Sequence, residues 1–196
     1  MGSVVVVELD CCGIVPSIKW GDRVGVTERQ AACATVYGLR MDATGRAERV
    51  VDAARCRGAD AAFISAYLAT LRPQVGPERP LELELTNCSV PVLDGAVLAR
   101  TPLRRLRINW SGLQRVDADA FRGLENLLQE LELSHNLLDE FPAAVRNLTA
   151  LARLDLSRNR VRSLPQGAVF FHLLKLRHLN LNHNRFVRVY NVFNAQ

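Results

Sequence analysis

The chain of 196 residues is long enough for one domain or two small ones, with a sizeable core. Its 48% hydrophobic and 23% charged residues exclude wholesale disorder, and the lack of an uncharged apolar run of about 18 residues argues against a transmembrane helix. The net charge of +5 is too small to imply nucleic acid, so no nucleic-acid partner is expected. Of the 25 basic residues 23 are arginine, which suits planar anionic partners.

The first residues do not have the pattern of a signal peptide. The apolar run Val4–Val7 is compatible with a strand, but Glu8 and Asp10 interrupt it and no basic region precedes it. We therefore expect either an intracellular protein or a sequence whose true amino terminus is missing. The odd count of five cysteines leaves the redox compartment and the disulfide state open. They are Cys11, Cys12, Cys33, Cys56 and Cys88.

Three alanine-rich segments between residues 28 and 71 suit helices. They are Glu28 to Tyr37, Arg46 to Arg55 and Asp60 to Leu71. In the last of these, four apolar side chains share one helical face and would cover an apolar surface. These four are Phe63, Tyr67, Leu68 and Leu71.

The composition changes near Pro80. Residues 1–79 hold 12 Ala, 4 Leu and no Asn, whereas residues 80–196 hold 25 Leu and all 11 Asn. Three prolines and a glycine between Arg72 and Pro80 favour extended or turn structure and mark a linker. The sequence therefore predicts a partly helical amino-terminal segment over 1–79, capping or poorly ordered, and a second domain over 80–196.

The second domain is built from a repeat with the frame LxxLxLxxNxL. Copies start at residues 80, 103, 128, 151 and 176, with spacings of 23, 25, 23 and 25 residues. Each Leu-x-Leu predicts a short strand whose leucines point inward, and stacked coils then form one parallel sheet. A buried Asn can satisfy backbone groups of the turn, so Asn136, Asn159 and Asn184 are predicted to form a ladder, with Cys88 and Ser111 as poorer substitutes.

The rest of each copy carries a second apolar pattern, including Phe121, Phe141 and Phe170, that would line the opposite side. The segment 151–174, LARLDLSRNRVRSLPQGAVFFHLL, resembles the typical class of leucine-rich repeat in animal cell-surface and matrix proteins such as chaoptin, connectin and the Toll-like receptors. The resemblance covers residues 80–196. It implies an α/β fold, a leucine-rich-repeat solenoid with a concave parallel sheet, whose usual activity is binding. The cysteine caps of secreted members are not reproduced, and the copy at 176 is short and leaves an apolar end, so either a fragment or a missing partner is expected.

Solvent-facing positions of successive strands form columns across the predicted sheet. Opposite charges alternate in the first two columns, so their arginines are either partner contacts or members of a self-neutralising ladder. In the fourth column an exposed Trp beside His and Arg has the composition of a binding hot spot, although Trp110 could instead fold over the second repeat. The predicted partner-binding residues are Trp110, His135, Arg158, His183, Arg105, Arg107 and Arg153.

Residues 156–196 carry seven basic side chains and no Asp or Glu. Such a patch could engage an acidic protein or a sulfated glycan, or could be balanced by acidic residues in downstream repeats. The seven are Arg158, Arg160, Arg162, Lys175, Arg177, Arg185 and Arg188.

Three tripeptides fit the N-glycosylation acceptor, at Asn87, Asn109 and Asn147. Asn147 is the best candidate because it falls on the outer loop side of its repeat. A glycan on Asn109 would occupy the concave face and compete with the predicted partner.

Catalytic motifs, metal-ligand spacings and phosphate loops do not occur, so no enzyme, cofactor or metal is expected. Two function classes remain. One is an extracellular or cell-surface protein-binding module of the adhesion, receptor or matrix type, with a membrane reached only through segments outside this sequence. The other is an intracellular, cytoplasmic scaffold or adaptor, favoured by the missing signal peptide and the odd cysteines.

Overall fold

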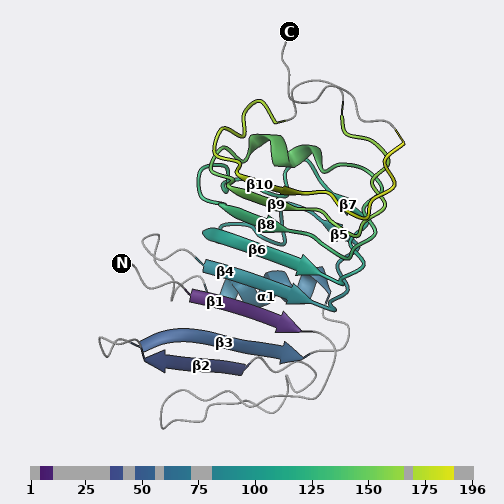
Figure 1. The fold of residues 1–196 in the computed structure, drawn as a ribbon. Helices are drawn as coiled ribbons and strands as arrows, with labels where there is room; N and C mark the ends of the chain where they lie inside the picture. The colour runs from purple at the N-terminus through teal and green to yellow at the C-terminus, as the bar shows by residue number, and fades with distance from the viewer. Residues whose placement is uncertain are drawn as a thin grey trace.

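The computed structural model describes residues 5–10, 36–41, 47–55, 60–71, 81–165 and 170–187. Within these residues, eight strands form one sheet with the order β10-β9-β8-β6-β4-β1-β3-β2 (Figure 1). Every neighbouring pair is parallel except β2 and β3, which run antiparallel. The predicted solenoid with a parallel sheet is confirmed. The strands are β1 (Val5–Asp10), β2 (Val36–Met41), β3 (Ala47–Arg55), β4 (Leu81–Thr86), β6 (Leu103–Asn109), β8 (Glu130–Glu132), β9 (Arg153–Asp155) and β10 (His178–Asn180).

The inward leucines set the register of the repeats. Leu106, Leu131 and Leu154 stand opposite one another on β6, β8 and β9, and all three are fully buried. Side chains alternate along a strand, so the residues that flank these leucines project to the other face, which we call the concave face. The paired strands place equivalent side chains of neighbouring coils about 4.8 Å apart, as the column alignment requires.

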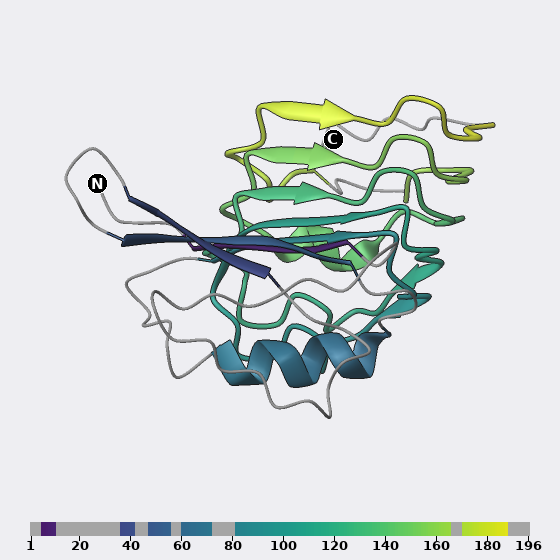
Figure 2. The same ribbon diagram turned by 90° about the horizontal axis from the view of Figure 1, so that it is seen from below.

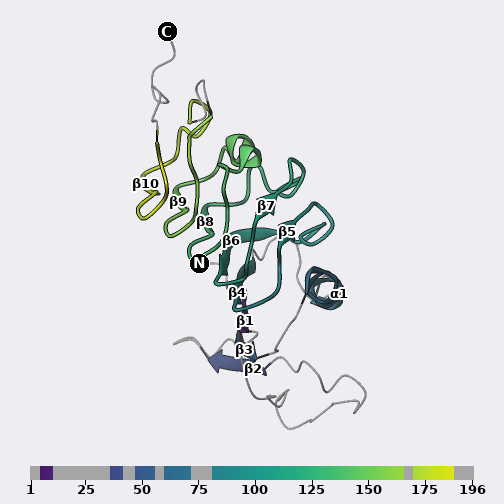
Figure 3. The ribbon, with the colours of Figure 1, turned by 90° about the vertical axis from the view of Figure 1, so that its right-hand side faces the viewer.

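The side opposite the sheet is built from short elements (Figures 2 and 3). They are α1 (Ala61–Leu71), the small parallel sheet of β5 (Val92–Leu93) and β7 (Arg115–Val116), and the 3-10 helix η3 (Ala143–Asn147). The phenylalanines predicted for this side are buried in the same core as the strand leucines. The rings of Phe141 and Phe170 pack edge to face with centroids 5.7 Å apart, which ties consecutive coils together.

The predictions for the amino-terminal segment have mixed outcomes. The helix over Asp60–Leu71 is confirmed as α1. The helix over Arg46–Arg55 is wrong, because Ala47–Arg55 form β3. Val50 and Val51 pair with β1, and this sheet pairing of β-branched residues outweighs the helix propensity of the surrounding Ala, Glu and Arg. Of the segment 28–37, only the last two residues are described, and they begin β2.

Both ends of the described amino-terminal segment pack onto the repeats. The strand suggested by Val4–Val7 is β1, which begins at Val5 and pairs with β4 and β3. On α1 the buried side chains are Ile64 and Leu68. Leu68 was predicted to cover an apolar surface; the other three members of that predicted face lie outside the described side chains. Sequence reasoning missed Ile64, although it lies one turn before Leu68 on the same face.

Candidate protein-binding face

The asparagine ladder lies behind the carboxyl ends of the strands. The Asn136 side chain accepts hydrogen bonds from the backbone N–H groups of Ser111 and Leu113 at 3.0 and 3.1 Å. Its amide nitrogen donates to the carbonyls of Ile108, Leu133 and Ser134 at 2.6 to 3.1 Å. Each such asparagine therefore satisfies backbone groups of two coils at once.

The next two coils repeat this arrangement. Asn159 accepts from the N–H of Leu138 and donates to three carbonyls, and Asn184 accepts from the N–H of Val161 and also donates to three carbonyls. Asn136 and Asn159 are buried, whereas Asn184 is half-buried. The ladder therefore fixes the backbone of the turn that follows each strand.

The two earlier coils use smaller side chains at this position. The Ser111 hydroxyl accepts from the N–H of Cys88 at 3.3 Å and donates to the carbonyl of Asn109 at 2.9 Å. Cys88 is disulfide-bonded. The other four cysteines all lie outside the described residues. The Ser111 side chain thus makes fewer hydrogen bonds to the backbone than the side chain of a ladder asparagine does.

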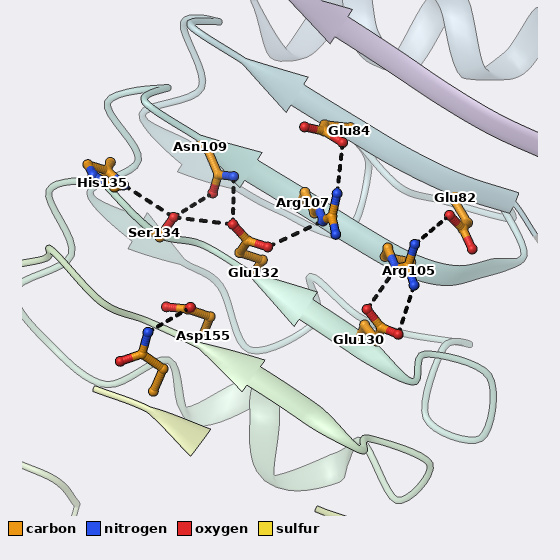
Figure 4. Close-up of polar contacts among 11 residues, drawn as sticks. Glu82, Glu84, Arg105, Arg107, Asn109, Glu130, Glu132, Ser134, His135 and Asp155 are labelled. Carbon is orange, nitrogen blue, oxygen red and sulfur yellow. Dashed lines mark hydrogen bonds and ion pairs between the residues drawn. The ribbon is translucent and has the colours of Figure 1, made fainter. Parts of the chain in front are cut away.

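Arg105 lies between two glutamates on the concave face (Figure 4). Its guanidinium contacts Glu82 of β4 at 2.8 Å and Glu130 of β8 at 2.7 and 2.9 Å, the latter with two nitrogens on two oxygens. Arg107 is placed in the same way between Glu84 at 3.1 Å and Glu132 at 3.2 Å. Two of the four arginines predicted as partner contacts, Arg105 and Arg107, are therefore engaged within the sheet.

The forked contact between Arg105 and Glu130 changes the ionisation of both groups. The hydrogen bond from Arg105 lowers the pKa of the Glu130 carboxyl below its ordinary value, against the opposing effect of burial. The hydrogen bond to Glu130 raises the pKa of Arg105, again with burial opposing it. The pair is ionised at neutral pH and acts as a fixed part of the face.

The network continues from Glu132 toward the ends of the strands. The Asn109 side-chain amide nitrogen donates to Glu132 at 3.0 Å, and the Ser134 hydroxyl donates to the side-chain Oδ1 of Asn109 at 3.1 Å (Figure 4). The ring Nδ1 of His135 lies 3.3 Å from the Ser134 hydroxyl. These bonds hold the His135 ring beside the sheet.

Five residues at the strand ends form what we call the rim column. All have positive φ, between 55° and 57°, a left-handed conformation that asparagine tolerates better than other non-glycine residues. They are Asn87, Trp110, His135, Arg158 and His183.

Trp110 and His135 of the rim column form a stacked aromatic pair. Their ring centroids lie 4.1 Å apart with an interplanar angle of 23°. The Trp110 side chain is 58% exposed, so it does not fold over the second repeat. A large exposed indole in a strained backbone conformation therefore lies next to a histidine that is hydrogen-bonded to Ser134.

Charges on the later coils are paired differently. Arg153 and Arg158 are exposed, and neither makes an ion pair within 4.0 Å with any residue in the described part of the chain. Asp155 is buried and bonds with neutral groups, accepting from the N–H of Ser157 at 2.8 Å and from the side-chain amide of Asn180 at 2.9 Å. His178 and His183 are also exposed.

The three glycosylation candidates differ in accessibility. Asn147 is exposed at the end of η3, away from the sheet. Asn109 lies on the concave face, where its side chain is hydrogen-bonded to Glu132 and Ser134. Asn87 belongs to the rim column and is half-buried.

Two features of the site were not foreseen from the sequence. One is the shared left-handed backbone of the rim column, which a recurring Asn or His before the ladder residue could have suggested. The other is a surface depression of about 300 Å³ beyond the strand ends. It is lined by Gln114, Leu137, Asp139, Arg160, Arg162 and Arg185.

The described residues lack two other kinds of feature. Among the described residues, no three or more His, Cys, Asp or Glu side chains are placed to hold a metal ion. No helix in the same part of the chain has the length and apolar character needed to cross a membrane.

Residues 101–161 match the family model of the leucine rich repeat. The chain is 40% identical to fibromodulin from Sus scrofa over 81 residues, which cover 38% of this chain and 54% of that sequence. It is 33% identical to vasorin from Mus musculus over 87 residues, 44% of this chain and 13% of vasorin. Over 106 residues, 54% of this chain, it is 32% identical to the transforming growth factor beta activator LRRC33 from Danio rerio, covering 15% of it. The chain thus spans about half or less of these relatives.

Proposed function

We propose that this chain, a leucine-rich-repeat protein of the animal cell-surface and matrix kind, is a protein-recognition module of the adhesion, receptor or matrix type that acts through its concave face. The observation that carries the proposal is the exposed Trp110, held in a left-handed conformation and stacked on His135. An exposed tryptophan beside histidine and arginine has the composition of an interface hot spot. Such a face supports binding rather than catalysis as the activity.

The proposed contact surface is the part of the face whose side chains form no ion pair with another described residue, although His135 is hydrogen-bonded to Ser134. It comprises Trp110, His135, Arg158 and His183 of the rim column together with Arg153. Arg105 and Arg107 are assigned a different role, because ion pairs to glutamates on both sides leave their guanidiniums engaged. They shape the floor of the face rather than contact the partner.

The test is a binding screen of the full chain against a panel of purified extracellular proteins. Trp110→Asn removes the indole while keeping a residue that suits the left-handed backbone. We expect it to weaken binding to a partner identified in the screen about tenfold or more. Phe171→Asn is the matched control, because Phe171 is 57% exposed but lies away from the sheet, and it should leave binding unchanged. Equal affinity of the Trp110 variant and the unaltered chain would contradict the proposal.

We propose an extracellular or cell-surface location, with an intracellular scaffold as the alternative. Two observations support it: Cys88 is disulfide-bonded, and the acceptor Asn147 is exposed. Expression in secreting animal cells should give a product whose mass falls on glycosidase treatment, and Asn147→Gln should remove that difference. An unglycosylated product with Cys88 reduced in the native source would favour the cytoplasmic scaffold.

We propose that residues 1–79 cap the repeats over 80–196. The support is the parallel pairing of β1 with β4 and the burial of Ile64 and Leu68 in the repeat core. Leu68→Ala should then lower the free energy of unfolding by about 3 kcal/mol, and hydrogen exchange should accelerate in β4 and β6 as well as in α1. The control Ala69→Gly, exposed on the same helix, should cost about 1 kcal/mol. Exchange confined to α1 would indicate an independent segment.

We further propose that the partner is acidic, either an acidic protein or a sulfated glycan. The excess of basic residues after Asp155 supports it, since residues 156–196 contain no Asp or Glu. Retention on heparin resin that decreases with salt is the expected result, and salt-insensitive retention would contradict it.

A further inference from the structure

Three arginines line the flank of the solenoid beyond the carboxyl ends of the strands. Arg160 and Arg185 each directly follow a ladder asparagine, and Arg162 lies two residues after Arg160 on the same coil. With Gln114, Leu137 and Asp139 they line the depression of about 300 Å³. We call this depression the arginine pocket.

The backbone places these arginines on adjacent coils. The N–H of Arg160 donates to the carbonyl of Leu138 at 2.8 Å, and the N–H of Arg185 donates to the carbonyl of Val161 at 2.9 Å. The coils therefore stack here as in the sheet, at about 4.8 Å. Val161 is fully buried, so the neighbouring Arg160 and Arg162 both turn toward solvent.

The positive charge of the pocket is not compensated. All three arginines are exposed, and none makes an ion pair within 4.0 Å with a described residue. Asp139 is the one acidic side chain among the lining residues. The three guanidinium groups repel one another, and one carboxylate offsets only part of that repulsion. An anion bound between the arginines would relieve it.

We propose that the arginine pocket binds the sulfate groups of a sulfated glycan chain. Guanidinium groups bind tetrahedral oxyanions through paired N–H donors, and arginines on two coils can share one sulfate through different oxygens. A carboxylate offers only two coplanar oxygens, which suits a single guanidinium better than three. The inference rests on the proposed acidic partner and decides between its two classes in favour of the glycan.

The concave face is a poor alternative location for such a chain. On β4, β6 and β8 it carries four glutamates around Arg105 and Arg107, and these glutamates would repel sulfate. Lys175 and Arg177, which are exposed on the last described coil, add to the basic character of the later coils. The glycan is therefore assigned to the flank, and the protein partner to the face.

The test measures binding of a heparin decasaccharide to the full chain by calorimetry. The triple variant Arg160→Gln, Arg162→Gln, Arg185→Gln should bind about tenfold more weakly or worse. The matched control is Arg100→Gln, Arg122→Gln, Arg146→Gln, which removes the same charge from exposed positions elsewhere; Arg100 and Arg122 line a separate depression before the strands. This control should retain the original affinity within about twofold. Equal losses in both triple variants would overturn the proposal, since they would indicate a diffuse charge effect.

A gain of affinity provides an independent test. Asp139→Asn removes the carboxylate from the pocket and should tighten decasaccharide binding about threefold, whereas Asp119→Asn, at an exposed acid elsewhere, should change it little. Unchanged affinity in the Asp139 variant would count against the pocket. Preference for polyglutamate over the decasaccharide, or full displacement by inorganic sulfate at equal charge concentration, would overturn the glycan assignment. Trp110→Asn should keep decasaccharide affinity, so failure of the concave-face proposal is read separately.

Discussion

The two halves of the concave face use similar charged residues in opposite ways. On β6, Arg105 and Arg107 each lie between a glutamate of β4 and a glutamate of β8 and contact both. On β9 the equivalent Arg153 has Glu130 on one side and His178 on the other, and it makes no ion pair with a described residue. Glu130 already accepts both of its close contacts from Arg105. The availability of a charge therefore depends on its neighbours in the column and not on its type.

The difference also separates the ion-paired part of the molecule from the surfaces that we propose for recognition. The first half has two arginines among four glutamates, so it is net acidic and self-contained. The second half and the flank hold uncompensated arginines such as Arg153, Arg158 and Arg160. An anionic partner is attracted to the second region and repelled by the first. The solenoid can thus combine one ordered network of ion pairs with two kinds of contact surface.

The largest expected effect concerns the ladder that both halves share. Asn159→Ala would leave three carbonyls and the N–H of Leu138 without their present partner in a buried position. We expect the free energy of unfolding to fall by about 3 kcal/mol, measured by chemical denaturation. A fall below about 1 kcal/mol would mean that water replaces the amide and that the ladder does not hold the two halves together.

A matched pair of substitutions tests the difference between the halves directly. Arg105→Gln removes two ion pairs and should lower the free energy of unfolding by about 1 to 2 kcal/mol. Arg153→Gln, at the same column position on β9, should change it by less than about 0.5 kcal/mol because it breaks no ion pair. Denaturation of both variants in low and high salt measures the contrast. Equal destabilisation would remove the distinction between the two halves.

The pH dependence of stability sharpens the same contrast. The pKa of Glu130 is lowered in the folded chain, so its stabilisation is present above the ordinary value of 4.5 and is lost as pH falls through the lower folded value. Glu130→Gln should remove this component, which we put at about 1 kcal/mol for a pair whose side chains are 31% and 34% exposed. Stability measured from pH 7 down to pH 3 should fall less steeply in the variant. Parallel curves for both proteins would show that the pair contributes nothing measurable.

Repeat patterning made the architecture and much of the face predictable. Periodic leucines such as Leu106 and Leu131 specify the strand, its register and therefore the columns. A register shift of one residue would move every side chain of the strand to the opposite face of the sheet. Helix propensity failed over Arg46–Arg55, where pairing with β1 decides the outcome and no local signal reports it.

The sequence also could not tell which column charges are engaged. Arg105 and Arg153 occupy equivalent positions with the same residue type, and only side-chain geometry separates them. The sequence placed Arg160, Arg162 and Arg185 in a basic patch, but it could not show that they line one depression, because Arg160 and Arg185 are 25 residues apart and come together only through the stacking of coils. The sequence pattern therefore predicts where a residue lies in the solenoid, whereas its ion-pair partners follow only from the three-dimensional structure.

An equally small effect on stability is expected at Trp110, the residue with the largest proposed role in recognition. Trp110→Asn relieves the left-handed strain of a bulky residue but loses the stack on His135, two terms of about 0.5 to 1 kcal/mol with opposite signs. We therefore expect a net change within about 0.5 kcal/mol in denaturation, against the large loss in partner binding. Destabilisation of about 2 kcal/mol or more would instead make Trp110 a structural element of the second coil. The rim column would then join the self-contained half of the face, and recognition would have to be assigned to Arg153 and Arg158.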